Sequence, residues 1–192
     1  MTDDAWLARW LPAIEARARA RPVLEVGCGA GHDTESLVRA GLRVVAFDIS
    51  PEQVQAARRR APGAEIRCQS VLDRFPLEGT GVPVIVASLS LHYFSWSQTG
   101  QLFERLRQTL ATDGLLLCRL NSTQDRHFGA TGHPEIERHY RLVDGQPKRF
   151  FDREDLDALF AQGWHIVSIL HGHTGKYGAT KALWEVAAER AA

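Results

Sequence analysis

Short apolar runs alternate with amphipathic stretches along most of the chain. Apolar runs of about four to eight residues bounded by glycine or polar residues are typical of buried strands, and apolar residues repeated every three or four positions are typical of helices. The pattern predicts strands at residues 22–27, 42–49, 64–69, 83–91, 114–120, 164–170 and 182–188. It predicts helices at residues 4–20, 33–41, 50–61, 97–111 and 152–162.

The predicted strands contain few polar positions, whereas a sheet with one solvent-exposed face shows a regular alternation. Strands of this kind, joined by helices, indicate a parallel sheet that helices cover on both faces. The last two strands are joined by a loop of about a dozen residues instead. No internal repeat or second core is visible, so the sequence predicts a single α/β domain over residues 1–192.

Two segments depart from the alternation of strand and helix. In residues 4–20 the apolar positions predict one amphipathic helix, bent or restarted near Pro12, with Trp6 and Trp10 as core residues. Residues 121–149 are rich in Gly, His, Pro and charge, and they predict an irregular excursion from the sheet. Because long irregular segments at such places often carry function, we expect this excursion to border a bound ligand.

Charge and hydropathy restrict the classes of partner. The chain has 23 Lys plus Arg and 23 Asp plus Glu, a formal net charge of +0, which gives no support to a general affinity for nucleic acid or for an anionic membrane. The N-terminus has no apolar core of a signal peptide, and no later run is long enough to span a bilayer. We expect a cytoplasmic monomer or homodimer that acts on a small molecule.

Cysteine and histidine spacing gives no sign of a metal site. Cys28, Cys68 and Cys118 lie in or beside apolar runs and form no CxxC pair, so they are predicted to be reduced and mostly buried. The eight histidines match no standard zinc spacing. The sequence therefore predicts no metal ligands.

The stretch LEVGCGAGHD places Gly27, Gly29 and Gly31 directly after the first predicted strand. Glycines at the carboxyl end of a strand allow a sharp turn and a close approach of the backbone to a ligand. The dinucleotide fingerprint needs a glycine where this chain has His32. Glu25 at the strand end disfavours a phosphate but suits an ammonium or sulfonium group, and we expect it to orient the loop through backbone N–H groups. The pattern favours S-adenosylmethionine over NAD.

A second carboxylate supports a nucleoside ligand. Asp48 ends the second predicted strand, 21 residues after Gly27. This is close to the offset of about 20 residues at which a carboxylate reaches ribose hydroxyl groups. Ile49 follows directly and is placed to lie against an adenine face.

The residues of these motifs carry a resemblance to a known family. LEVGCGAGHDTESLVRAGLRVVAFDIS resembles the first two motifs of class I S-adenosylmethionine-dependent methyltransferases, VASLSLHYF their fourth-strand segment, and LATDGLLLCRL their fifth strand and its approach. The paired terminal strands resemble the hairpin at the family's sheet edge, so the resemblance covers nearly the whole chain. It implies a Rossmann-like three-layer sandwich with a seven-stranded, mostly parallel sheet and an antiparallel C-terminal hairpin strand. The short length and KRFFDREDLDALF resemble small bacterial methyltransferases of the tellurite-resistance type.

The resemblance implies S-adenosyl-L-methionine as cofactor and S-adenosyl-L-homocysteine as product. Ser70 stands where many relatives have an acid that contacts adenine, and the backbone of Val71 is expected to meet the ring edge. Residues 1–20 are expected to act as a helix and lid, and residues 121–149 as an insertion near the acceptor. The expected cofactor contacts are Glu25, Gly27, Cys28, Gly29, Gly31, Asp48, Ile49, Ser70, Val71 and Ser88.

Methyl transfer depends chiefly on alignment of the nucleophile with the C–S bond, and a general base is needed only if the acceptor must lose a proton. His92 and Tyr93 follow the fourth strand, are expected to face the cleft, and are the catalytic candidates. ASLS replaces the NPPY-type tetrad of amide and adenine N-methylating enzymes, which disfavours nucleic-acid bases as acceptors. A second set lies in the excursion: Asn121, His127, His133, His139, Tyr140, Lys148 and Arg149.

The function predicted from the sequence is S-adenosylmethionine-dependent methyl transfer to a small-molecule acceptor. Two alternatives stay open. One is a binding module that keeps the cofactor without turnover, and the other is a nicotinamide-dependent oxidoreductase, against which His32 argues.

Overall fold

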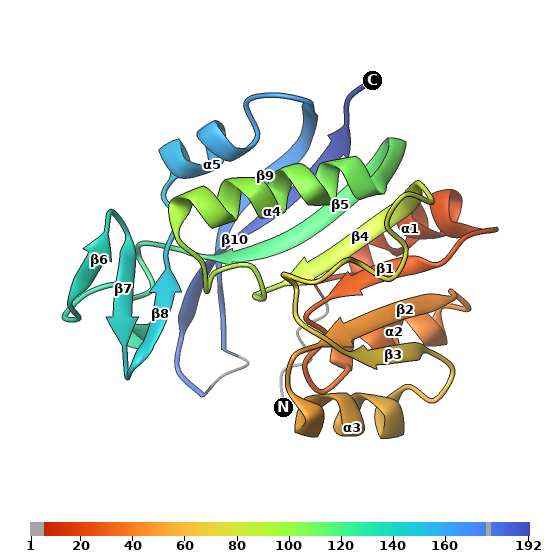
Figure 1. Ribbon diagram of the computed structural model, residues 1–192, viewed down its shortest axis with the longest axis horizontal. Helices are drawn as coiled ribbons and strands as arrows, with labels where there is room; N and C mark the ends of the chain where they lie inside the picture. Colours follow the sequence, from red (N-terminus) through yellow and green to blue (C-terminus); the bar gives the residue numbers. More distant parts are fainter. Residues whose placement is uncertain (1–5, 176–177) are drawn as a thin grey trace.

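The computed structural model describes residues 6–175 and 178–192. Over these residues a seven-stranded sheet has the strand order β3-β2-β1-β4-β5-β10-β9, with helices on both faces (Figure 1). The predicted three-layer α/β sandwich is therefore confirmed. The strands of its parallel part are β1 (Val23–Val26), β2 (Val44–Asp48), β3 (Glu65–Cys68), β4 (Val82–Ser88) and β5 (Leu110–Asn121).

The strand order reverses beside β1, which lies between β2 and β4. The chain leaves β1 toward β2 on one side and returns at β4 on the other, so the connections after β1 and β4 diverge. In open α/β sheets this reversal creates the crevice in which ligands bind. In the ladder, Glu25 of β1 lies opposite Val86 of β4, and Ser88 at the end of β4 lies opposite Arg119 of β5.

The two C-terminal strands complete the sheet. β10 (Lys181–Arg190) pairs antiparallel with β5 on one side and with β9 (Trp164–Thr174) on the other. The antiparallel C-terminal hairpin implied by the family resemblance is confirmed. Both strands are longer than their apolar runs predicted. Polar residues continue the β9–β10 ladder to the pair of Thr174 and Lys181.

Helices bury an apolar cluster against each face of the sheet. On one face α1 (Leu11–Ala18), α2 (His32–Arg39) and α3 (Pro51–Arg60) cover a core that includes Val23, Val84 and Leu117. On the other face α4 (Trp96–Thr109) and α5 (Arg153–Leu159) cover Leu24, Ile85 and Leu116. Within the described part of the chain, no helix is long and apolar enough to cross a bilayer.

The N-terminal segment is restarted near Pro12, as predicted. A short 3-10 turn, η1 (Ala8–Trp10), leads into α1, which has Pro12 in its first turn. Trp6 is buried, and its indole Nε1 donates a hydrogen bond of 3.0 Å to Asp33 in the first turn of α2. Residues 4–5 of the predicted helix lie outside the described residues.

The prediction of an irregular excursion at residues 121–149 was wrong. The segment contains a 3-10 turn, η2 (Arg126–Phe128), and an antiparallel sheet of β6 (Glu135–Glu137), β7 (Tyr140–Val143) and β8 (Gln146–Arg149), which lies beside the main sheet (Figure 1). Asp144 and Gly145 connect β7 to β8 with φ angles of +51° and +80°. Positive φ at both central residues of a two-residue hairpin is the reason for the Asp-Gly preference there.

Candidate functional site

A cavity of about 1540 Å³ opens where the strand order reverses. The loops that follow β1, β2, β3 and β4 line it, together with the first turn of α2. Gln146 and Pro147 from β8 also line it, and so do Gly175 and Gly178 between β9 and β10. Nine of the ten residues expected to contact a cofactor are among its lining: Glu25, Gly27, Cys28, Gly29, Asp48, Ile49, Ser70, Val71 and Ser88.

Hydrogen bonds to β2 hold the glycine loop after β1. The backbone N–H groups of Gly27 and Cys28 both donate to the carbonyl oxygen of Phe47, at 2.9 and 3.0 Å. The N–H of Gly29 donates to Oδ2 of Asp48 at 2.8 Å, and the other oxygen of Asp48 accepts from the N–H of Ser50 at 3.0 Å. Asp48 thus ties the glycine loop to the start of α3.

The expected role of Glu25 in orienting this loop was wrong. Its Oε2 accepts a hydrogen bond of 2.6 Å from the hydroxyl of Thr34 in α2, while the N–H of Gly29 donates to Asp48. Glu25 is only 3% exposed, yet it lines the cavity. Glu25 therefore joins β1 to α2 and gives the cavity a negative wall.

Gly31 is the predicted cofactor residue that does not line the cavity. It has a φ of +81° and directly precedes α2, and a Cβ at this position would lie 2.8 Å from Cα of Ala57 in α3. Helices α2 and α3 therefore approach each other at Gly31. A Cβ at Gly27, which has a φ of +72°, would overlap Ser90 of the segment after β4. The loop thus packs tightly on both sides.

The candidate residues around the rim differ in exposure. Ile49 is 70% exposed beside Asp48, so its side chain is free to meet a ligand surface. The hydroxyl oxygen of Ser70 accepts a hydrogen bond from the backbone N–H of Leu72. The backbone N–H of Ser70 donates a hydrogen bond to Asp73. Burial raises the pKa of the Cys28 thiol, so this residue stays uncharged in the loop.

The two catalytic candidates, Tyr93 and His92, differ in burial and in their position relative to the cavity. Tyr93 lines the cavity and is 45% exposed, and burial of its hydroxyl followed by the charge of Asp48 raises its pKa. A phenol of raised pKa stays protonated near neutral pH, so it donates hydrogen bonds and does not act as a base.

His92 does not line the cavity, contrary to the expectation that it faces the cleft. It is 5% exposed, and burial, together with the charges of Lys181 and Lys148, lowers its pKa to about 3. Its carbonyl oxygen accepts from the N–H of Arg149 at 2.7 Å, so its backbone holds the end of β8. A histidine with so low a pKa is a weak proton acceptor, and the arrangement assigns it to packing.

The second set of candidates within residues 121–149 also lies outside the lining of the cavity. Asn121 and Arg149 are buried, and the hydroxyl of Tyr140 donates to the carbonyl of Tyr93 at 3.0 Å. The residues of the insertion that line the cavity are Gln146 and Pro147, at the start of β8. The Asp-Gly turn just before them was the signal in the sequence for this hairpin.

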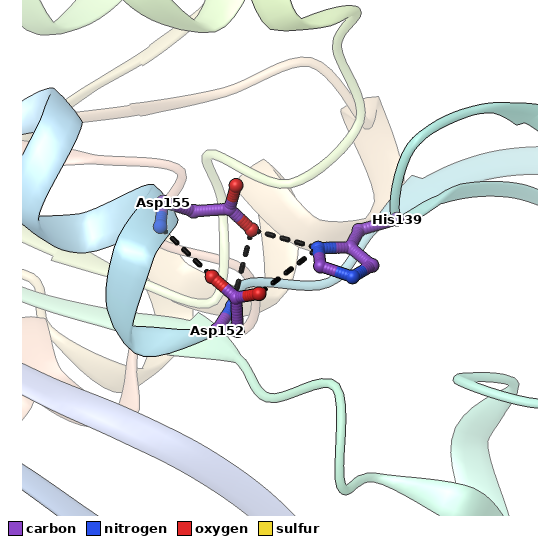
Figure 2. A group of neighbouring side chains, drawn as sticks. All are labelled: His139, Asp152 and Asp155. Carbon is purple, nitrogen blue, oxygen red and sulfur yellow. Dashed lines mark hydrogen bonds and ion pairs between the residues drawn. The ribbon is translucent and has the colours of Figure 1, made fainter.

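His139, Asp152 and Asp155 lie together where the small sheet meets α5 (Figure 2). Nδ1 of His139 is 2.9 Å from Oδ2 of Asp155. Asp152 and Asp155 form the capping box of α5, and the guanidinium of Arg138 contacts both carboxylates at 2.7 and 3.0 Å. Because a side-chain cation already pairs with these oxygens, the group anchors the small sheet to α5 and does not suit a metal ion.

Part of the chain is similar in sequence to known proteins. Residues 23–114, from β1 through α4, match a family model described as a methyltransferase domain. Trans-aconitate 2-methyltransferase of Paracidovorax citrulli is 34% identical over 119 residues, which cover 58% of this chain and 45% of that protein. Residues 23–114 are therefore similar in sequence to a methyltransferase domain.

Two solved structures extend the likeness in fold beyond the matched methyltransferase domain. An S-adenosylmethionine-dependent methyltransferase from Mesorhizobium loti has a TM-score of 0.73 at 20% identity and covers 98% of this chain and 99% of its own. Magnesium protoporphyrin IX methyltransferase from Synechocystis, solved with bound S-adenosylhomocysteine, has a TM-score of 0.72 at 18% identity. The match covers 99% of this chain and 82% of that protein. The chain aligns with less than half the length of the Paracidovorax relative.

Arg119 is a charged residue of the cavity that sequence reasoning missed. Arg119 of β5 lines the cavity and is 1% exposed, and its Nε donates to the hydroxyl of Ser88 at 2.9 Å. Its guanidinium lies 4.7 Å from the ring centroid of Trp6. A single arginine within the apolar run GLLLCRL was the available signal.

Gly31 and Gly41 provide a matched test of packing at the start of α2. Both have positive φ, +81° and +78°, but a Cβ at Gly41 would meet nothing within 4 Å. Both alanine variants incur backbone strain, and Gly31→Ala adds overlap with Ala57, so we expect it to lower the free energy of unfolding by about 1–3 kcal/mol more than Gly41→Ala. Urea unfolding measures the difference, and equal stability of the two variants would contradict the packing role.

The buried state of His92 predicts how stability depends on pH. Its pKa is about 3 in the folded chain and 6.5 when unperturbed, so between these values only the unfolded chain binds the proton. Stability from this residue is full above pH 6.5 and is lost as pH falls toward 3, by at most about 1.4 kcal/mol per pH unit.

We expect His92→Gln to show a shallower loss of stability than the wild type between pH 6.5 and 4, measured by urea unfolding. Histidine NMR of the folded wild type checks the same point independently. Titration of the His92 ring near pH 6.5 would contradict its assignment to packing.

Proposed function

We propose that the protein transfers a methyl group from S-adenosyl-L-methionine to a small-molecule acceptor. The observation that carries this proposal is a glycine loop with two carboxylates, Glu25 and Asp48, on the wall of one large cavity at the reversal of strand order. The methyltransferase domain match over the same residues supports it.

The proposed cofactor site uses the residues that line this cavity. Asp48 keeps acceptor capacity beyond its two backbone hydrogen bonds, because each carboxylate oxygen has two lone pairs, and we assign it to the ribose hydroxyl groups. Ile49 is assigned to one adenine face, with Ser70 and Val71 at the ring edge. The negative wall at Glu25 suits the ammonium and sulfonium end of the cofactor.

The same electrostatics argue against a nicotinamide dinucleotide. A pyrophosphate at the loop would lie close to the carboxylate of Asp48, which already accepts the N–H of Gly29. That N–H is of the kind that a phosphate-binding loop presents to its ligand. The alternative of an oxidoreductase is therefore not favoured.

The bound cofactor supplies an electrophilic methyl group, and the chain has to align an acceptor with it. Tyr93 lines the cavity with its hydroxyl protonated, so we assign it to orienting the acceptor by hydrogen bonding. We assign no general base, because the buried His92 does not line the cavity. An acceptor that reaches the site already deprotonated fits this arrangement best.

The acceptor is proposed to be a small polar or anionic molecule that enters beside Gln146 and Pro147, with residues 121–149 as one wall and residues 1–20 as a cover. The position of these two residues in the cavity lining supports the first assignment. The Paracidovorax relative, by its name, methylates trans-aconitate, which is a carboxylate. Because this chain aligns with only part of that protein, the acceptor of the chain is not taken from it.

Binding and turnover are tested in turn. Titration calorimetry is expected to show one binding site for S-adenosylhomocysteine. NADH added to the protein beforehand is expected to leave the heat of S-adenosylhomocysteine binding unchanged. Radiolabelled S-adenosylmethionine, incubated with the protein and a panel of small carboxylates, phenols and thiols, then separates an enzyme from a silent binding module. Absence of S-adenosylhomocysteine binding would overturn the proposed function, and binding without transfer would favour the silent module.

Asp48→Asn tests the ribose assignment. The amide keeps one oxygen for the loop but loses the charge that strengthens hydrogen bonds to hydroxyl groups, so we expect affinity for S-adenosylhomocysteine to fall by about 1.5–3 kcal/mol. Asp113→Asn is the control, because Asp113 lies before the apolar run of β5, outside the cavity lining, with a φ of +60° that asparagine tolerates. Equal affinity of the two variants in calorimetry would remove the assignment.

A further inference from the structure

Arg119 is a buried cation at the point where the parallel strands reach the cavity. It shares one face of β5 with Leu115 and Leu117, which are buried in the core cluster under α1, α2 and α3. The row on this face changes from apolar to charged at Arg119, which lies opposite Ser88 at the end of β4 and lines the cavity. Arginine is rarely buried to 1% exposure, and an apolar residue would continue the packing of the row.

A hydrogen bond and a ring contact help to orient the guanidinium group. Its Nε donates to the hydroxyl of Ser88 at 2.9 Å, and its Cζ lies 4.7 Å from the ring centroid of Trp6. Trp6 is itself held by the hydrogen bond from its indole Nε1 to Asp33. A guanidinium group has five N–H donors in a planar arrangement that matches the geometry of a carboxylate, and Nε of Arg119 uses one of them toward Ser88.

The opposite charge lies on the same face of the sheet, on β1, which β4 separates from β5. Glu25 of β1 lies opposite Val86 of β4, two residues before Ser88, and Ser88 pairs with Arg119 across the next ladder. Because side chains two apart on a strand share a face, Glu25, Ser88 and Arg119 project into one side of the cavity. A negative and a positive group with one strand between them are complementary to a ligand that carries both an ammonium and a carboxylate group.

We propose that Arg119 binds a carboxylate group inside the cavity. This inference rests on the proposed function, in which two ligands can bring a carboxylate: the amino-acid end of the cofactor, or an acidic acceptor. The placement of Glu25 on the same face favours the amino-acid end of the cofactor, since both of its charges then have a partner. Arg119 is a binding residue in either case.

The test compares Arg119→Gln with wild type toward two ligands that differ by one group. S-adenosylhomocysteine carries the carboxylate, and its decarboxylated analogue, S-adenosyl-3-thiopropylamine, lacks it. If Arg119 binds the cofactor carboxylate, the variant loses about 10- to 100-fold in affinity for S-adenosylhomocysteine and binds the analogue as wild type does. Arg119→Lys, which keeps the charge but not the fork, is expected to fall between wild type and Arg119→Gln.

A second arm examines an acidic acceptor. Succinate, fumarate and citrate are titrated into protein saturated with S-adenosylhomocysteine, with their amides as neutral controls. If Arg119 binds the acceptor, affinity for S-adenosylhomocysteine is unchanged in Arg119→Gln, whereas the heat of carboxylate binding seen with wild type is lost. Arg190→Gln is the matched control, because Arg190 donates to the carbonyl of Leu110 and does not line the cavity.

The outcomes separate this inference from the proposed function. Wild type that binds neither S-adenosylhomocysteine nor its analogue contradicts the proposed function itself. Wild type and Arg119→Gln that bind both nucleosides alike, with no loss of carboxylate binding in the second arm, overturn the role of Arg119 alone. Thermal unfolding of each variant checks that it is folded, and Arg119→Lys decides the question if Arg119→Gln does not fold.

Discussion

The turn after β1 is the constraint on which the rest of the structure depends. In five residues, 27–31, the chain leaves the centre of the sheet and starts α2, and it packs against the segment after β4 and against α3 as it does so. Positive φ at Gly27 and Gly31 makes the turn possible, and the absence of a Cβ lets Ser90 and Ala57 approach. The N–H of Gly29 is then held by Asp48, so the loop and the second strand form one rigid edge of the cavity.

The strands that reach this edge carry charges of opposite sign. Glu25 and Asp48 bring negative charge to β1 and β2, while Arg119 brings positive charge to β5, and Tyr93 remains neutral between the two sides because burial raises its pKa. In a partly buried cavity such charges act with less screening than they would in water. The arrangement selects for a ligand with a cationic centre and an anionic end, and it disfavours one that carries phosphate at the glycine loop.

The main sheet was predictable because its signal is strong at every strand. The run from Val44 to Phe47 is apolar throughout, and α3 and α5 begin within one residue of the helices predicted at residues 50–61 and 152–162. The small sheet was missed because β6 and β8 are short and largely exposed, so they carry neither an apolar run nor a regular alternation. Their formation depends on the Asp-Gly turn and on the anchoring of His139 and Arg138 to α5.

The site was predictable only in part. Residues close in sequence to the glycine loop or to the end of β2 could be assigned, since the position along a strand determines which side chains reach the carboxyl edge. Burial of His92 could not be assigned, because it depends on β8, whose Arg149 donates to its carbonyl. The arginine within the apolar run of β5 is visible in the sequence, but its place opposite Ser88 depends on the register between β4 and β5.

The most direct test of this account is hydrogen exchange of backbone amides with and without S-adenosylhomocysteine. The account predicts that the largest slowing of exchange falls on the glycine loop, residues 27–31, and on residues 48–50 at the end of β2. NADH at the same concentration is expected to leave both segments unchanged. Slowing that is absent from the glycine loop, or that NADH reproduces, would contradict the assignment of the cavity to a sulfonium nucleoside.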